Sequence, residues 1–387
     1  MEDKSIMAKL DLPAEHEPLY IDNVLITRRE LELTTPFKAP FGRFTHLVRF
    51  YPMITFKREN GETITGIGEC SPLSAPWYNY ECHRTVENAL EHISSSLLKE
   101  KAPVTDVISF IKRYGWINGH NIAKAGIEGA YWDAAAKLNN LPVYKLWGGS
   151  RKEVEAGISL GIESSPEALL KKLDAAVELK ASRVKIKVKP GKDIEYLEII
   201  RKNYPSLPLM ADANGSYDLF SPEHKALLKE FDNYSLMMIE QPGMNDDIID
   251  HSRELAHINT PVCLDESILH LTHARHAVEL WKHYSAADRL IINIKPPRVG
   301  GYLEAIKIAR FCGVNGVKAW CGGMFESALG KTANVHFSSL EEINLPGDHI
   351  SIAPYFVNDI ADSPEYSEGK INVPNLSGWG TANLRLD

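Results

Sequence analysis

The chain has 387 residues, of which 44% are hydrophobic and 24% charged, a composition that is ordinary for a globular protein with a large buried core. The length predicts about two domains, although a single α/β barrel takes roughly 250 residues by itself. The formal net charge of -8 argues against a nucleic-acid partner and against an anionic membrane surface.

Cysteine usage and the N-terminus bear on the cellular compartment. The five cysteines are odd in number and none are spaced as a CxxC pair, which favours a reducing compartment over a disulfide framework or a cysteine zinc site. The N-terminus lacks the apolar stretch of a signal peptide, and no run of about 18 apolar residues predicts a spanning helix. We therefore expect a cytoplasmic protein without a membrane partner.

Residues 1–150 combine strand patterns with helix patterns, after a loose leader at residues 1–18. Strands are predicted at 46–56 and 63–69, joined by a turn at 59–62, and helices at 81–98 and 120–139. The sequence therefore predicts an α+β domain in this part of the chain.

From residue 154 the pattern changes to short apolar runs, each followed by an amphipathic helix, which is typical of parallel βα units. The strand-like runs are 154–162, 183–189, 207–214, 236–242, 261–267, 288–296 and 316–323, with a weaker one near Ile350. The helix-like stretches include 166–180, 193–204, 222–231 and 301–312. This number of units favours a closed (β/α)7β-type TIM-like barrel over 151–350 rather than an open sheet. Residues 351–387 are expected to close the barrel and return to the first domain.

Charged residues fall at the ends of five of these strands. Lys187, Asp212, Glu240, Asp265 and Lys295 follow one another at intervals of 25, 28, 25 and 30 residues, about one βα unit each. A buried parallel strand tolerates a charge only when that charge is paired or bound to a metal ion. Because the C-terminal strand ends of such barrels form the active site, we expect these five side chains to converge there.

The three carboxylates predict a metal site. Asp212, Glu240 and Asp265 offer the hard oxygen ligands that Mg²⁺ prefers, and no histidine lies at these strand ends to favour zinc. Any one of them alone could be a helix cap or a salt bridge at the barrel mouth. Three in register favour Mg²⁺, with Mn²⁺ as a substitute.

The lysines predict proton transfer. Lys185 and Lys187 lie two residues apart on one strand, so both point to the same face. Their mutual repulsion is expected to lower the pKa of at least one, which suits a general base. Lys295 lies four strands later and faces the opposite side of a central substrate. The alternative, a solvated edge strand, is disfavoured by the apolar neighbours Val184 and Ile186.

Together these groups suit the removal of a proton from carbon beside a carboxylate. Such a proton is weakly acidic, and its loss places two negative charges on the carboxylate oxygens. A divalent cation stabilises that charge while a lysine takes the proton. The expected substrate is therefore a small-molecule carboxylate.

The motifs that carry these residues resemble the enolase superfamily, in its muconate-lactonizing subgroup. They are KIK at 185–187, DAN at 212–214, EQP at 240–242, DES at 265–267 and NIKPPRVGG at 293–301. The segments 35–42, 66–73 and 141–149 resemble the capping domain of that superfamily. The run WCGGMFESALG at 320–330 resembles the family of o-succinylbenzoate synthases and N-succinylamino acid racemases.

The resemblance implies a role for each residue. Lys187 would be the base, assisted by Lys185, with Lys295 as the second lysine and the three carboxylates as Mg²⁺ ligands. Residues expected near the substrate or behind the ligands are Asn214, Arg298, Gly322, Gly323, Met324 and Phe41. The backbone at 322–324 would seat a succinyl carboxylate, and a flexible loop at 37–44 would close over the substrate.

One departure concerns the residue before Arg298. The family usually reads KPGR where this chain has KPPR, and Pro297 stiffens the turn that places Arg298. In this branch the arginine is expected to accompany racemase activity.

The implied activity is that of a lyase, an o-succinylbenzoate synthase that performs a Mg²⁺-dependent syn-dehydration in menaquinone biosynthesis. N-succinylamino acid racemase, alone or as a second activity, is the alternative. Dipeptide epimerase or cycloisomerase is a further alternative, although epimerases typically carry an Asp-x-Asp pair at the eighth strand. A non-catalytic binding or scaffold barrel is disfavoured because all five charged residues are present. A homo-oligomer is left open.

Overall fold

The N-terminal part of the chain forms an antiparallel sheet with helices packed against it. Its strands are β1 (Leu19–Ala39), β2 (Gly42–Arg58) and β3 (Thr63–Ile67), in that order across the sheet. Its helices are α2 (His83–Lys99), α3 (Val107–Ile111), α4 (Asn121–Leu138) and α5 (Val143–Leu146). The computed structural model describes residues 16–39, 42–161, 163 and 165–386.

Small residues allow β3 to lie directly on α4. A Cβ atom on Gly66 would lie 1.9 Å from the carbonyl oxygen of Ala130, and one on Gly68 would lie 1.9 Å from that of Gly126. Only glycine, which has no Cβ, permits so close an approach of strand to helix. The alanine-rich pattern that predicts the helix therefore also provides the face on which the strand packs.

The strands and helices predicted in this part are confirmed, with one correction. The turn at 59–62 joins β2 to β3 as expected. Residues 37–39 and 42–44, which belong to the segment expected as a flexible loop, instead pair in the β1–β2 ladder, where Phe37 is opposite Phe44, and closure over the substrate stays a prediction. Pairing between the two strands satisfies backbone groups that an open loop would leave to solvent. Phe41, predicted to contact substrate, lies outside the described residues.

Eight parallel strands in the described part of the chain form the barrel. They are β4 (Glu153–Leu160), β5 (Arg183–Lys187), β6 (Leu209–Asp212), β7 (Ile239–Glu240), β8 (Val262–Leu264), β9 (Leu290–Ile294), β10 (Lys318–Cys321) and β11 (Gly347–Ile350). Neighbours pair in chain order from β4 to β10, and β11 pairs with β4. Asn344 and Leu345, just before β11, donate backbone hydrogen bonds to Ala319 in β10 and so close the ring.

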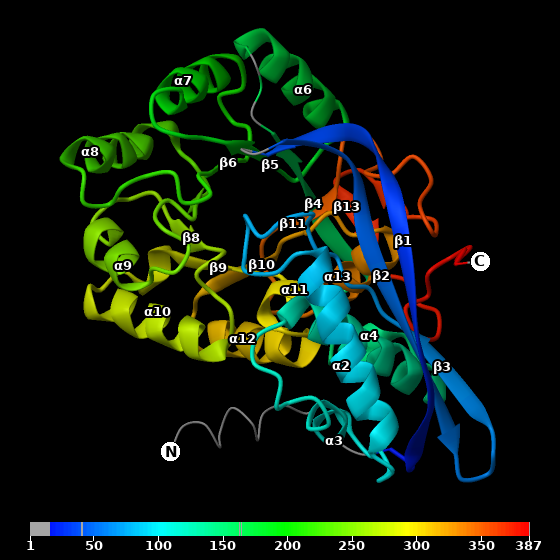
Figure 1. Ribbon diagram of the computed structural model, residues 1–387. Coiled ribbons are helices and arrows are strands. Elements are labelled where there is room, and N and C mark those ends of the chain that lie inside the picture. Colours follow the sequence, from blue (N-terminus) through cyan, green and yellow to red (C-terminus); the bar gives the residue numbers. More distant parts are fainter. Residues whose placement is uncertain (1–15, 40–41, 162, 164, 387) are drawn as a thin grey trace.

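Helices connect these strands on the outside of the barrel. They are α6 (Pro166–Glu178), α7 (Asp193–Asn203), α8 (Pro222–Glu230), α9 (Ile249–Leu255), α10 (Leu271–His283), α12 (Tyr302–Val314) and α13 (Ala328–Ser338), with the short α11 (Pro296–Val299) after β9. Figure 1 shows α6 to α10 around one side of the barrel and the β1–β3 sheet of the capping domain on the other. The order confirms the predicted (β/α)7β-type barrel with an α+β capping domain.

Local sequence signals explain where several barrel helices begin. The side chains of Ser165 and Ser221 accept hydrogen bonds from the first turns of α6 and α8, and each is followed by a proline. Serine satisfies a free N–H group at a helix start, and proline fits the first helical position because no donor is needed there. Nearly all residues of β5 to β9 are buried, as parallel barrel strands must be.

The C-terminal segment lies against both parts of the molecule. Its strands β12 (Tyr366–Ser367) and β13 (Lys370–Asn372) form a hairpin, and β13 pairs antiparallel with β4. A backbone hydrogen bond of 2.9 Å from Thr34 to Tyr355 joins the segment to β1. The predicted domain boundaries stay predictions.

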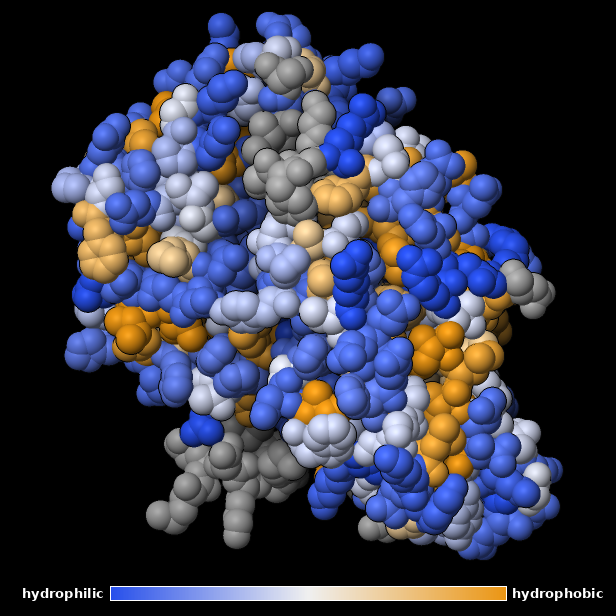
Figure 2. Space-filling view, in the orientation of Figure 1, coloured by the Kyte–Doolittle hydropathy of each residue, from blue (hydrophilic) through white to orange (hydrophobic). Residues whose placement is uncertain are grey.

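The surface is mostly hydrophilic on the face shown in Figure 2, with apolar residues in scattered groups. Within the described ranges, none of the helices has the length and apolar character needed to cross a membrane. The five cysteines are free thiols.

Candidate active site

The five charged residues predicted from their spacing lie at the same end of the barrel. Lys187, Asp212 and Glu240 are the last residues of β5, β6 and β7, and the parallel register places each beside the next. Asp265 directly follows β8, and Lys295 directly follows β9. The C-terminal ends of barrel strands converge on one opening, so these side chains surround it.

Asp212 lies between two lysines. Its Oδ2 atom is 2.7 Å from Nζ of Lys187 and 3.1 Å from Nζ of Lys185. Burial acts to raise the pKa of Asp212, but the two ammonium groups outweigh burial and hold that pKa below its ordinary value. The side chain of Lys187 is 30% exposed and that of Lys185 only 5%, so of these two it is Lys187 that faces the barrel mouth.

Glu240 is fully buried next to Asp212. Its Oε2 atom lies 2.9 Å from Nζ of Lys185, and its Oε1 atom accepts a hydrogen bond of 2.7 Å from Nδ2 of Asn293. Burial and the charge of Asp212 raise the pKa of Glu240 in spite of these partners. A carboxylate with a raised pKa marks a position where further positive charge is stabilising.

Asp265 is held by two cations and a tyrosine. Nζ of Lys295 lies 2.8 Å from its Oδ2 atom, and the guanidinium of Arg298 contacts its Oδ1 atom. The hydroxyl of Tyr78 lies 3.1 Å from both carboxylate oxygens and accepts a hydrogen bond of 2.9 Å from Lys295. Burial acts to lower the pKa of Lys295, but Tyr78 and nearby carboxylates raise it well above its ordinary value. Because Tyr78 belongs to the capping domain, both domains build this side of the centre.

The environment of Lys185 corrects one prediction. Repulsion between Lys185 and Lys187 is expected from the sequence to lower the pKa of at least one of them. Burial does act to lower the pKa of Lys185, but Asp348, Glu240 and Asp212 together raise it well above its ordinary value. The prediction is wrong for Lys185 because carboxylates from neighbouring strands surround its ammonium group.

Asn214 links the exposed lysine to a further carboxylate. Its Oδ1 atom accepts a hydrogen bond from Lys187, and its Nδ2 atom donates one of 2.9 Å to Oε1 of Glu266. Its backbone lies in the left-handed region at φ 42°, which asparagine tolerates, and its N–H donates to Asp212 at 3.1 Å. Oε2 of Glu266 is buried and has no hydrogen-bond partner among the described residues. Burial raises the pKa of Glu266.

The segment after β10 borders the second lysine. A Cβ atom on Gly322 would lie 2.6 Å from Cε of Lys295, so this glycine packs directly against the lysine side chain. Within the described ranges, the backbone N–H groups of Gly323 and Met324 donate no hydrogen bond. Adjacent free N–H groups beside an ammonium group suit the binding of a carboxylate.

The unusual Pro297 leaves Arg298 in the centre. Pro296 and Pro297 occupy the first positions of α11, where a helix needs no backbone donor. Asn121 of the capping domain donates a hydrogen bond of 2.7 Å to the carbonyl oxygen of Arg298. The arginine side chain is fully buried on Asp265.

Polar residues of this centre that are missing from the sequence-based set include Tyr78, Glu266 and Asp348. Asp348 on β11 lies 3.1 Å from Lys185 and 2.8 Å from Arg183. Glu266 stands inside the DES motif, and its position after Asp265 is a signal that could have identified it. Asp348 could have been found as the charge in the weak eighth strand. Tyr78 lies in a different domain and has no such signal.

The carboxylates of this centre offer the oxygen ligands that Mg²⁺ prefers. Asp212, Glu240, Asp265 and Glu266 place hard oxygens at the ends of three successive strands. As they lie, the first three are turned toward lysine or arginine, and no group of three or more His, Cys, Asp or Glu in the described chain is arranged to hold an ion. The unpartnered oxygen of Glu266 and the raised pKa values of Glu240 and Glu266 fit a centre that takes up a cation.

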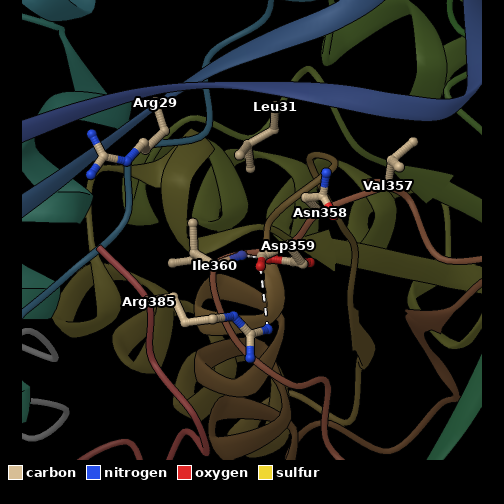
Figure 3. Close-up of a pocket in the computed structure, with 7 residues that line it drawn as sticks. All are labelled: Arg29, Leu31, Val357, Asn358, Asp359, Ile360 and Arg385. Atoms are coloured by element: carbon tan, nitrogen blue, oxygen red, sulfur yellow. Dashed lines mark hydrogen bonds between the residues drawn. The ribbon is translucent and has the colours of Figure 1, made fainter. Parts of the chain in front are cut away.

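Two surface pockets lie apart from this centre. One has a volume of about 460 Å³ and lies beside β1, with walls formed by Arg29, Leu31, Val357, Asn358, Asp359, Ile360 and Arg385 (Figure 3). The other has a volume of about 830 Å³ and is lined by residues 151–155 together with residues from α13, the segment before β11 and β13. Of the predicted site residues that the structure describes, none lines either pocket.

Comparisons with known proteins agree with the fold and the motifs. Residues 168–383 match the enolase C-terminal domain-like family, and residues 24–148 match the mandelate racemase / muconate lactonizing enzyme N-terminal domain. An o-succinylbenzoate synthase of Geobacillus kaustophilus is 37% identical over 361 residues, which cover 93% of this chain and 92% of that protein. An N-succinylamino acid racemase of Amycolatopsis sp is 33% identical, over 94% of this chain and 95% of that protein.

A similar solved structure supports the same superfamily. A member of the enolase superfamily from Enterococcus faecalis V583 is 35% identical and superposes with a TM-score of 0.83, over 95% of this chain and 96% of that one. The chain therefore belongs to the enolase superfamily and, within it, to the family of o-succinylbenzoate synthases and N-succinylamino acid racemases.

Proposed function

We propose that the chain is an o-succinylbenzoate synthase, a cytoplasmic lyase that dehydrates a succinyl-bearing hydroxycyclohexadiene carboxylate in menaquinone biosynthesis. The observation that carries the proposal is the placement of Lys187 and Lys295, four strands apart in an eight-stranded barrel, on opposite sides of one cluster of carboxylates. The relative from Geobacillus kaustophilus carries this activity in its name and supports the same assignment.

Lys187 is the proposed base. As a free amine it takes the proton from the carbon beside the substrate carboxylate, and the electron pair of that C–H bond forms a new ring double bond. The C–O bond on the adjacent carbon breaks, and the departing hydroxide receives the proton that Lys187 has taken, so that the lysine is regenerated and the products are o-succinylbenzoate and water. Asp212 and Asn214 hold the nitrogen of Lys187 in place through their hydrogen bonds.

Lys295 is the proposed electrostatic partner on the other face of the substrate ring. An ammonium group over a ring that becomes aromatic gains a cation–π contact. Nζ of Lys295 makes a contact of this kind with the ring of Tyr78, at 4.5 Å from the ring centre, which supports the proposed role.

Asp212, Glu240 and Asp265 are the proposed ligands of Mg²⁺, for which Mn²⁺ can substitute because it prefers the same hard oxygen donors. The ion would supply positive charge opposite the carboxylate oxygens that become more negative when the proton leaves. The free N–H groups of Gly323 and Met324 are the proposed seat of the succinyl carboxylate.

The position of Lys295 also favours N-succinylamino acid racemase as an alternative or second activity. Racemisation needs one acid–base group on each face of the α-carbon, and Lys187 and Lys295 face each other across the barrel. An epimerase is less favoured, because β11 carries Asp348 followed by His349 and Ile350 rather than an Asp-x-Asp pair.

The test is turnover of the cyclohexadiene precursor by purified protein with Mg²⁺, followed by ultraviolet absorbance. A kcat/KM on the order of 10⁴ M⁻¹s⁻¹ or more supports the synthase, because this is the low end of ordinary enzymes. Absence of turnover by folded, metal-loaded protein contradicts it. Deuterium exchange at the α-carbon of N-succinylamino acids then tests the racemase.

A further inference from the structure

Residues 324–325, in the segment after β10, are held by hydrogen bonds from the capping domain. Arg49 on β2 is fully buried, and its guanidinium donates to the carbonyl oxygens of Met324 at 3.3 Å and of Phe325 at 2.5 and 3.1 Å. It also donates to the carbonyl oxygens of Val48 and Pro72, each at 2.8 Å, within its own domain. The arginine therefore ties the backbone of the barrel segment to the backbone of the capping domain.

A second capping-domain residue holds the other end of this segment. Glu69 accepts hydrogen bonds from the N–H of Ser327 at 2.8 Å, from Oγ of Ser327 at 2.5 Å and from the N–H of Gly330 at 2.7 Å. These donors belong to the start of α13, where a carboxylate satisfies free N–H groups and interacts favourably with the helix dipole. The side chains of Glu69 and Arg49 are 3.7 Å apart and both are buried.

The C-terminal segment adds to the same helix start. Asp359, at the pocket wall drawn in Figure 3, accepts a hydrogen bond of 3.1 Å from the N–H of Ala328. The N-terminus of α13 is thus fixed from both the capping domain and the C-terminal segment.

The hydrogen bonds from Arg49 maintain an unfavourable backbone conformation at Phe325. Phe325 has φ 57°, in the left-handed region that a bulky residue rarely adopts. Such a conformation persists only where the surrounding contacts determine it, and it often marks a functional site. The contacts here include two hydrogen bonds from Arg49 to the carbonyl oxygen of Phe325 itself.

We propose that Arg49 and Glu69 are positioning residues for recognition of the substrate's remote carboxylate. They bind the carbonyl side of residues 324–325 and the start of α13, and thereby leave the N–H groups of Gly323 and Met324 available to that carboxylate. The inference rests on the proposed function, because it concerns the seat of the succinyl group. Neither residue contacts Lys187 or Lys295 through a hydrogen bond, so we expect both lysines to keep their own hydrogen bonds when the contacts of Arg49 and Glu69 are weakened.

The variants are Arg49→Lys and Glu69→Gln, with Glu128→Gln as a matched control. Glu69 accepts through both carboxylate oxygens, so glutamine turns a donor toward the N–H groups of α13. Glu128 is also a buried capping-domain carboxylate at the start of a barrel helix, where it accepts from the N–H of Leu303. Both of its hydrogen bonds go to Oε1, so glutamine retains them.

The readout is the separation of KM from kcat on two probes, an N-succinylamino acid and the N-acetyl derivative of the same amino acid, which lacks the remote carboxylate. Arg49→Lys and Glu69→Gln are expected to raise KM for the succinyl probe by about tenfold or more, with kcat changed by less than about threefold. On the acetyl probe they leave kcat/KM within about threefold of wild type. Glu128→Gln is expected to leave the kinetic constants for both probes unchanged. Equal losses on both probes, or a loss in kcat alone, would overturn the proposal.

A binding measurement separates failure of this inference from failure of the proposed function. Calorimetry with o-succinylbenzoate and with benzoate needs no turnover. A wild type that turns over nothing can still bind o-succinylbenzoate more tightly than benzoate. If Glu69→Gln then abolishes that preference, the positioning role stands without the activity. Equal affinities of the wild-type protein for the two compounds, or an unchanged preference in Glu69→Gln, would overturn the positioning role.

Discussion

The imidazole of His336 on α13 donates a hydrogen bond of 2.8 Å to the carbonyl oxygen of Trp379 in the C-terminal segment. Its Nδ1 atom accepts one of 3.3 Å from the backbone N–H of Tyr144 in α5. A carbonyl oxygen only accepts and a backbone N–H only donates, so the two contacts require the neutral ring with its proton on Nε2. One side chain therefore joins the barrel, the capping domain and the C-terminal segment.

Replacing His336 with glutamine is expected to remove an acid-sensitive contribution to stability. Burial lowers the pKa of His336 from 6.5 to about 4. Between these values the unfolded chain binds a proton that the folded chain does not, so the contribution is present above pH 6.5 and is lost as the pH falls to 4. It amounts to on the order of 3 kcal/mol. Unfolding free energies from pH 4.5 to 7.5 should show the wild-type advantage shrinking toward acid; a constant difference contradicts this.

Glu128→Gln is expected to have the opposite dependence on pH. Burial raises the pKa of Glu128 from 4.5 to about 7, so the folded chain keeps a proton that the unfolded chain loses. The wild-type contribution is therefore complete below pH 4.5 and is lost as the pH rises through 7. The free energy of unfolding of the variant should therefore rise relative to that of wild type, by up to about 3 kcal/mol over this interval. Unfolding free energies over the same pH series measure this difference. A variant that becomes more stable relative to wild type toward acid pH would contradict the raised pKa of Glu128.

The arrangement of charged residues along the barrel could be predicted from the sequence because the fold is periodic. A βα unit takes a nearly constant number of residues, so charges such as Asp212 and Glu240, spaced one unit apart, reach equivalent strand ends. The same periodicity predicts the strand boundaries to within a few residues.

The remaining parts of the site depend on contacts that no local pattern records. Tyr78 reaches Asp265 across 187 positions of sequence, through the docking of one domain on the other. The raised pKa of Lys185 depends on Asp348, which barrel closure places on the strand next to β4. Spacing within the chain says nothing of either contact, which is why the sequence predicts neither the Tyr78 hydroxyl in the site nor the direction of the pKa shift of Lys185.

Lys187→Ala is expected to lower kcat by about 10²- to 10⁴-fold, the usual contribution of a positioned acid–base group. The matched control is Lys189→Ala, which removes an exposed lysine two residues further along the chain. Circular dichroism and the unfolding midpoint check that both variants are folded. Full activity of Lys187→Ala, or an equal loss in Lys189→Ala, would contradict the assignment of the base.

Removal of divalent metal by a chelator is expected to abolish turnover, and Mg²⁺ is expected to restore it. Since the ion binds the folded chain, Mg²⁺ should also raise the unfolding midpoint, by an amount equivalent to about 2.7 kcal/mol when the free ion is about 100 times its Kd. Asp212→Asn and Glu240→Gln should lose both effects. A midpoint that Mg²⁺ leaves unchanged in wild type would contradict the metal site at these carboxylates.

Gly322→Ala is expected to lower kcat/KM by about 10²-fold, because a displacement of a reacting group by about 1 Å has an effect of that size. The added methyl group would lie 2.6 Å from Cε of Lys295 and 2.5 Å from Oδ1 of Asn293, so both side chains, or the backbone at Gly322, must move. Gly161→Ala is the control, since a Cβ atom there meets nothing within 4 Å. Steady-state kinetics with the precursor compare the two variants, and the unfolding midpoint confirms that each is folded. If Gly322→Ala is as active as Gly161→Ala, the close packing of Gly322 against Lys295 is not needed for turnover.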